Sequence, residues 1–143
     1  MSKVNNVPLI SIVLNNLKKT RIFDEVYVAS DSKKISNLAK KHGANTSYLR
    51  PKKLSDDFTP VTNLVSDFCK WIFNKKIKCD TVSLIYPTSI FIKPTVLKKS
   101  YKFFLKNNSE YLLPIKRFPH PIQRGFKLDK KLRINRINIQ HNY

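Results

Sequence analysis

Three polar segments of this 143-residue chain carry side chains that could hold a charged, hydroxyl-bearing ligand. In the first segment, Arg50 can donate a forked pair of hydrogen bonds to a phosphate or a base carbonyl. Thr59 precedes Pro60, where a helix is expected to begin, and the N–H groups at a helix start can bind an anion. On physical grounds alone, a surface arginine and an ordinary helix N-cap explain these two residues equally well.

The other two segments offer hydroxyl, amide and guanidinium groups. Tyr86-Pro-Thr-Ser89 could place hydroxyls at a ligand, although a turn that ends a strand is the simpler interpretation. The run from Phe118 to Arg124 combines a stiff proline backbone with the amide of Gln123 and the guanidinium of Arg124, which suit a ligand with a carboxylate and hydroxyls. A structural loop is the simpler interpretation of this run as well.

Helices and strands that alternate along the chain must position these segments. Apolar residues at helical spacing predict helices from Pro8 to Thr20, after Asp31-Ser32 up to His42-Gly43, from Pro60 to Ile72, and from Pro94 to about Lys106. Short β-branched and aromatic runs predict strands over 25–30, 46–49, 81–86 and 111–115, and a hairpin of 123–128 with 132–137 around Asp129-Lys130. This alternation predicts an α/β fold with a mainly parallel sheet and helices on both faces. Ligands bind beyond the carboxyl ends of such strands, where the segments after Leu49, Tyr86 and Ile115 would meet.

Length and composition predict one soluble domain. The chain is 41% apolar, and no apolar run approaches the roughly 20 residues of a membrane span. Its first residues lack the apolar core of a signal peptide, so we expect a cytoplasmic protein with no membrane partner. Cys69 and Cys79 have no His or further Cys at metal spacing, which favours buried free thiols.

The formal charge of +19 raises nucleic acid as a partner, but the distribution of the charge argues against it. Most of the 28 basic residues are Lys, whose pairs are spread over the whole chain and occur with the Asn, Ile, Phe and Tyr that A/T-rich codons produce. We therefore expect solvated faces and no nucleic-acid partner. The glycine-rich, nucleophile-elbow and zinc-helix motifs of common NTPases, dehydrogenases, hydrolases and zincins are absent from the sequence.

Five segments in order along the chain carry a family resemblance: Ile22–Asp31, Ala39–Gly43, Leu49–Thr59, Leu84–Ser89 and Phe118–Arg124. Their order and spacing resemble the sugar-acid cytidylyltransferases over nearly the whole chain. The Arg-Pro-x-x-Leu-Ser-Asp-Asp-x-Thr and Phe-Pro-x-Pro-Ile-Gln-Arg segments are most similar to the pseudaminic acid branch, with CMP-sialic acid synthetase more distant. The resemblance implies a Rossmann-like fold of the nucleotide-diphospho-sugar transferase type.

The resemblance also implies an activity, which is the transfer of CMP from CTP to the anomeric hydroxyl of a nine-carbon sugar acid with release of pyrophosphate. CTP and the sugar acid would be the partners, Mg²⁺ the cofactor, and a homodimer the plausible assembly. By similarity, the nucleotide would be bound by Arg50, Thr59 and Val61. The sugar acid would be bound by Tyr86, Thr88, Ser89, His120, Gln123 and Arg124. The resemblance assigns no catalytic residue and no metal ligand to a position of this chain.

The ends of the chain depart from the family pattern. The chain starts near Asn6-Val7-Pro8, after the loop that grips the triphosphate in the family, and stops at Tyr143, before an Asp-containing segment and the metal carboxylates. We therefore expect residues 1–143 to form a single partial cytidylyltransferase domain, truncated at both ends, with an incomplete sheet. A non-catalytic remnant of the same fold and a basic nucleic-acid-binding module are the alternatives.

Overall fold

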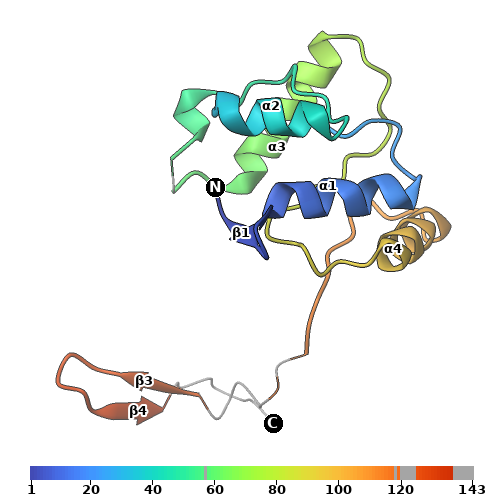
Figure 1. Cartoon of the computed structure of the whole chain (residues 1–143). Helices are drawn as coiled ribbons and strands as arrows, with labels where there is room; N and C mark the ends of the chain where they lie inside the picture. Colours follow the sequence, from blue (N-terminus) through green and yellow to red (C-terminus); the bar gives the residue numbers. More distant parts are fainter. Residues whose placement is uncertain (57, 118, 120–124, 137–143) are drawn as a thin grey trace. The chain divides into compact units, whose positions relative to one another are not determined.

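The chain forms helices separated by long irregular segments (Figure 1). The structure is a computed structural model that describes residues 1–56, 58–117, 119 and 125–136. These residues form two separate units, Met1–Asn108 and Ser109–Tyr143. The elements of the first unit are β1 (Lys3–Val4), β2 (Val7–Pro8), α1 (Leu9–Thr20), α2 (Lys33–Lys41), the 3-10 helix η1 (Lys52–Leu54), α3 (Val61–Asn74) and α4 (Pro94–Lys106). The second unit contains β3 (Phe126–Leu128) and β4 (Ile134–Arg136).

All four predicted α-helices are present, because their apolar periodicity is local and unambiguous. Pro94 opens α4 as predicted, and Gly43 follows α2 with a φ of +80°, a left-handed conformation that glycine adopts without strain. The predicted N-cap of α3 is wrong: Pro60 holds that position, and no side chain caps the helix. None of the helices in the described ranges is long and apolar enough to cross a membrane.

A short parallel pairing lies at the centre of the first unit. The N–H of Val28 donates to the carbonyl of Asn45 (2.9 Å), and the N–H of Asn45 donates to the carbonyl of Val26 (2.8 Å). Parallel bridges join Tyr27 to Asn45 and Ser30 to Leu49, so the predicted strands over 25–30 and 46–49 do pair. Val26 and Val28 pack against a buried cluster of Ile10, Leu14, Ala39 and Ala44, contributed by α1, α2 and the segment after α2.

Four aromatic side chains pack α3 against the paired segments: Tyr27, Tyr48, Phe68 and Trp71. Tyr27 lies between Val26 and Val28, so its side chain points to the opposite face of the segment. Its ring meets Phe68 and Trp71 edge to face, with centroids 5.2 and 5.8 Å apart, and the ring of Tyr48 meets the same two side chains at 5.1 and 5.5 Å. The Tyr48 hydroxyl also donates a 2.8 Å hydrogen bond to Oδ2 of Asp67. Helices therefore cover both faces of the paired segments.

The strands predicted over 81–86 and 111–115 do not form in the described residues. Strand structure needs a neighbouring backbone, and no described segment supplies a ladder to either run. Val82, Leu84 and Tyr86, alternate residues of the first run, are exposed. The buried state predicted for the cysteines is also wrong. Cys69 and Cys79 are free but exposed, since Cys69 is displaced from the aromatic face of α3 and Cys79 lies in the irregular stretch after it.

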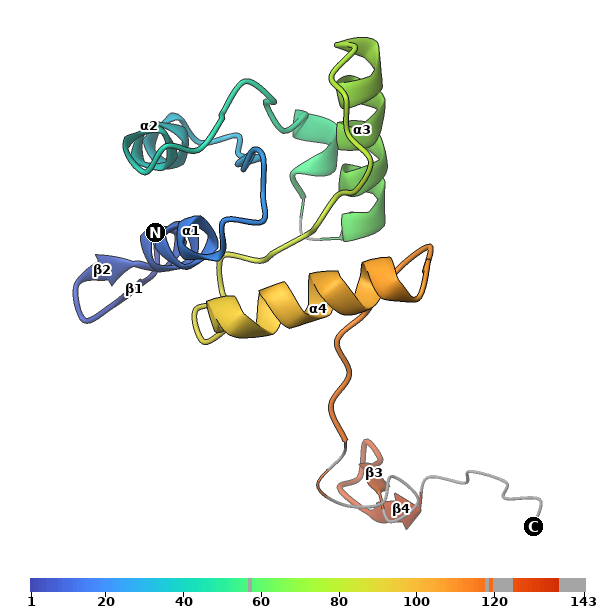
Figure 2. The same ribbon diagram turned by 90° about the vertical axis from the view of Figure 1, so that its right-hand side faces the viewer.

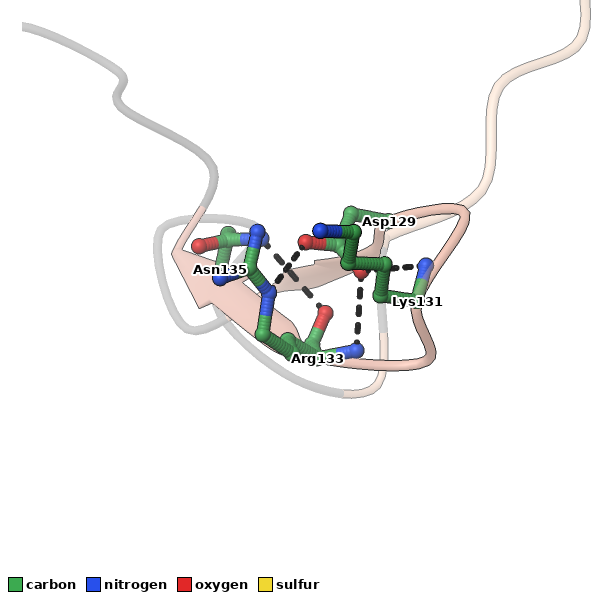
Figure 3. Close-up of polar contacts among 4 residues, drawn as sticks. All are labelled: Asp129, Lys131, Arg133 and Asn135. Carbon is green, nitrogen blue, oxygen red and sulfur yellow. Dashed lines mark hydrogen bonds and ion pairs between the residues drawn. The ribbon is translucent and has the colours of Figure 1, made fainter.

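The second unit contains the predicted hairpin around Asp129-Lys130, with β3 antiparallel to β4 and Lys127 opposite Asn135. Asp129 organises the turn (Figure 3). Its Oδ1 accepts from the N–H groups of Lys131 (2.8 Å) and Arg133 (3.0 Å), and its Oδ2 accepts from Nε of Arg133 (2.8 Å). These bonds hold the pKa of Asp129 below its usual value, with the backbone N–H of Arg133 the largest cause.

We expect Trp71→Ala to lower the free energy of unfolding by about 2–4 kcal/mol, because the half-buried indole contacts three aromatic rings. Phe73→Ala, on the same helix but 81% exposed, should change it by less than about 0.5 kcal/mol. Urea denaturation followed by far-ultraviolet circular dichroism measures both variants. Equal losses would show that the aromatic cluster does not hold α3.

A second prediction concerns alkaline pH. Burial, and then the bond to Asp67, raise the pKa of Tyr48 above its usual value, so the folded chain holds this proton more tightly than the unfolded chain. Stability from this group is complete below about pH 10 and falls by about 1.4 kcal/mol per pH unit above it, until the folded group ionises.

Tyr48→Phe should remove that alkaline loss and lower stability near pH 7 by about 1–3 kcal/mol, since it leaves Asp67 without its partner. Tyr111→Phe is the control, because this side chain is 75% exposed. Urea midpoints between pH 8 and 11 test the difference. Parallel pH curves for wild type and Tyr48→Phe would contradict it.

Candidate functional site

Arg50 stands at the end of the second paired segment, directly after Leu49. Its half-buried guanidinium turns back into its own loop, where Nε donates to the carbonyl of Leu54 at 2.7 Å and Nη2 donates to the same oxygen. A guanidinium carries five N–H donors, so three remain for a ligand. The bond to the last residue of η1 fixes the side chain at the carboxyl end of the pairing, the edge at which ligands bind in parallel α/β sheets.

Asp56 organises the rest of this loop. Its Oδ1 accepts from the N–H groups of Phe58 (2.8 Å) and Thr59 (2.6 Å), and its Oδ2 accepts from the hydroxyl of Thr59 (2.8 Å). The Thr59 hydroxyl, followed by the two N–H groups, holds the pKa of Asp56 below its usual value, so the carboxylate is ionised at neutral pH. The Thr59 proton is therefore committed, and its oxygen can offer a ligand only an acceptor.

Val61 is the first residue of α3 and is half-exposed. Because the Thr59 hydroxyl bonds to Asp56, no side chain caps the first turn of α3. In that turn the N–H of Asn63 donates to the carbonyl of Pro60 (3.0 Å), which leaves the N–H groups of Val61 and Thr62 for an acceptor from outside the helix. The structure thus brings Arg50, Thr59 and Val61 into one loop and helix start, although Thr59 plays a different local role from the predicted cap.

Tyr86, Thr88 and Ser89 form a separate turn. The N–H of Ser89 donates to the carbonyl of Tyr86 at 2.9 Å, and the N–H of Ile92 donates to the carbonyl of Ser89 at 3.2 Å. Tyr86 and Thr88 are exposed and Ser89 is half-buried. Nδ2 of Asn16 donates to the carbonyl of Ile90 (3.4 Å), which links this region to α1. Within the described ranges, no hydrogen bond joins the turn to the Arg50–Pro60 loop.

His120, Gln123 and Arg124, the other residues expected at the sugar acid, lie outside the described residues. The expected Mg²⁺ finds no carboxylate set in the part of the chain that is described, where no three His, Cys, Asp or Glu side chains gather to hold a metal ion. The described residues therefore do not fit a metal centre of their own.

Two groups at the loop were missed by sequence reasoning: the Asp56 carboxylate and the Leu54 carbonyl. The sequence did contain a signal for Asp56. An Asp side chain readily accepts hydrogen bonds from the backbone N–H groups two and three residues later, here those of Phe58 and Thr59. Nothing in the sequence marks the Leu54 carbonyl, since any residue type supplies one.

Comparisons with known proteins identify the matched region. A family model described as Cytidylyltransferase matches residues 1–130. The chain is 33% identical over 134 residues to the pseudaminic acid cytidylyltransferase of Campylobacter jejuni serotype O:2, which covers 94% of this chain and 58% of the relative. The protein of the same name from serotype O:23/36 is 31% identical with the same coverage. The CMP-N,N'-diacetyllegionaminic acid synthase of Legionella pneumophila is 31% identical over 64% of this chain and 39% of the relative.

The chain thus spans 58% of the length of the two Campylobacter relatives. The matched model covers the paired segments, the Arg50–Pro60 loop, the Tyr86–Ser89 turn and all four α-helices. The family implies an α/β fold, which agrees with helices packed on both faces of a parallel pairing. Because the family model matches residues 1–130 of the 143, the chain belongs to the cytidylyltransferase family.

Proposed function

We propose that the chain is part of an enzyme that transfers CMP from CTP to a nonulosonic acid of the pseudaminic type. The observation that carries the proposal is Arg50, which the Leu54 carbonyl holds at the end of a parallel pairing, in the loop that leads to the uncapped start of α3. A forked donor and open backbone N–H groups together suit the phosphates or the base carbonyl of a nucleotide. The names of the relatives support cytidine and a sugar acid as the two halves of the substrate pair.

The proposed reaction is a displacement at the α-phosphorus of CTP. The anomeric oxygen of the sugar acid forms a bond to that phosphorus, the bond to the bridging oxygen of the β-phosphate breaks, and pyrophosphate leaves. The hydroxyl proton passes to a base outside the residues assigned here. Arg50 and the start of α3 would bind and orient the nucleotide, with Val61 near the cytosine, so that the two reacting atoms are held in line.

The sugar acid would contact the second group of residues. Tyr86, Thr88 and Ser89 offer hydroxyl groups at one turn, and Ser89 and Tyr86 are already joined through their backbones. His120, Gln123 and Arg124 complete this proposed set, with Arg124 as the partner of the carboxylate. For the whole enzyme we propose Mg²⁺ as the cofactor and a homodimer as the assembly.

The proposal includes a mainly parallel, Rossmann-like sheet with helices on both faces. The pairing of 26–30 with 45–49 supports it, because α1 and α2 pack on one face and α3 packs on the other. Residues 81–86 would add a strand, since Val82, Leu84 and Tyr86 occupy alternate positions of a run that pairs with no described segment.

We expect CTP to stabilise the chain against heat. At a concentration about ten times Kd, binding to the folded state adds about 1.4 kcal/mol, which raises Tm by roughly 4–6 °C. Arg50→Lys, which keeps the charge but loses the fork, should remove most of this shift. Lys53→Ala, an exposed change in the same loop, should keep it. Absence of a shift at millimolar CTP with Mg²⁺, or equal shifts with ATP and CTP, would count against the site.

A second experiment tests the sugar-acid residues. Arg124→Ala should lose the extra thermal shift that pseudaminic acid adds in the presence of CTP, while the shift from CTP alone is unchanged. Arg117→Ala, an exposed arginine of the same region, is the matched control. If both arginine variants lose the two shifts together, the assignment of Arg124 to the carboxylate is wrong.

A further inference from the structure

The helices α1 and α4 pack against each other (Figure 2). A basic groove lies between the C-terminal end of α1 and the first turns of α4. It is a groove of about 610 Å³ that is open to solvent, and it is lined by five exposed residues, Asn15, Lys18, Lys19, Arg21 and Lys98. We propose that this groove binds a compact polyphosphate anion with three or more negative charges, such as inorganic pyrophosphate. It shares no lining residue with the Arg50–Pro60 loop or the Tyr86–Ser89 turn, so this site does not depend on the proposed transferase function.

In the described part of the chain, no carboxylate forms an ion pair with these cations. No Asp or Glu lines the groove, and neither α1 nor α4 contains one. Across the described ranges, the one recorded ion pair joins Arg133 to Asp129 in the second unit. The end of α1 carries about half a negative charge from its dipole, which Lys18 and Lys19 partly offset. The four cationic side chains, less this half charge of the helix end, leave a net charge of more than +3 in the groove.

Hydrogen bonds hold the backbone on both sides of the groove. The hydroxyl of Thr20, a residue only 1% exposed, donates to the carbonyl of Leu17 at 2.6 Å and holds the end of α1. Arg21 follows in a left-handed conformation with a φ of 53°, which turns the chain at the groove. On the other side, the bond from Asn16 to the carbonyl of Ile90 ties the segment before α4 to α1.

Asn15 adds a neutral donor. Its Oδ1 lies 3.2 Å from Nδ1 of His42, and with the proton on Nδ1 the histidine donates to that oxygen. The Nδ2 group of Asn15 then remains as a donor on a side chain that lines the groove. An amide donor beside four cations suits the several oxygens of a phosphate group better than it suits a carboxylate, which offers only two.

The number and convergence of the charges favour a polyphosphate over other anions. A single phosphate or sulfate carries about two charges and would leave the groove strongly positive. A nucleic acid spreads its phosphates along a strand, whereas these four cations converge on one groove from the end of α1 and the first turns of α4. Pyrophosphate concentrates at least three charges in a small volume.

Calorimetric titration of the whole chain at about 150 mM salt tests the proposal, with pyrophosphate, sulfate and a short single-stranded RNA as ligands. We expect one pyrophosphate per chain, bound at least tenfold more tightly than sulfate. Lys18→Gln/Lys19→Gln/Lys98→Gln should weaken pyrophosphate at least tenfold. Lys70→Gln/Lys75→Gln/Lys78→Gln removes the same charge from exposed lysines elsewhere and should keep the affinity within twofold.

Three results would overturn the proposal: equal losses in the two triple variants, equal affinity for sulfate, or RNA binding that is tighter than pyrophosphate and lost with the groove lysines. If the groove variant does not fold, amide chemical shifts of the wild-type chain decide the matter. Pyrophosphate should move the signals of residues 15–21 and 98, and shifts confined to residues 50–61 would refute the groove. The CTP-induced rise in Tm, measured on the same groove variant, should persist, which separates this proposal from the transferase proposal.

Discussion

The parallel hydrogen bonds between Val26, Asn45 and Val28 are the constraint on which the first unit depends. They hold two extended segments side by side, and alternate residues of those segments then face opposite ways. Val26 and Val28 pack against residues of α1 and α2, while Tyr27 packs against α3. Without this pairing, the helices would have no common surface against which to bury their apolar faces.

The same constraint positions the candidate site. The second paired segment ends at Leu49, and the chain turns at once into the loop that carries Arg50 and Asp56. Asp56 and the Leu54 carbonyl shape this loop from within, so the orientation of Arg50 comes from local hydrogen bonds and its location comes from the pairing. The proposed polyphosphate groove lies at the C-terminal end of α1 and the first turns of α4, so the two sites use different elements of the first unit.

The sequence allowed the helices, the hairpin turn at Asp129 and the position of Arg50 to be predicted, because each depends on residues close together in the chain. The strand predicted over 81–86 does not form in the described residues, because a strand needs a neighbouring backbone and apolar periodicity does not reveal one. Thr59 illustrates a local competition: its hydroxyl could cap α3 or bond to Asp56, and the structure has the second arrangement. The predicted burial of the two cysteines was wrong for a similar reason. Residue type gives only a preference for burial, whereas the actual exposure depends on the neighbouring elements.

Trp71 is the single tryptophan of the chain, and it lies among the aromatic side chains that join α3 to the paired segments. The rings of Tyr27 and Tyr48 are 5.8 and 5.5 Å from it, close enough for light absorbed by either tyrosine to be emitted by the indole. The molecule thus contains its own optical reporter. A change in tyrosine-to-tryptophan energy transfer would therefore report the separation of α3 from the paired segments without any attached label. The candidate site lies in the loop between those same elements.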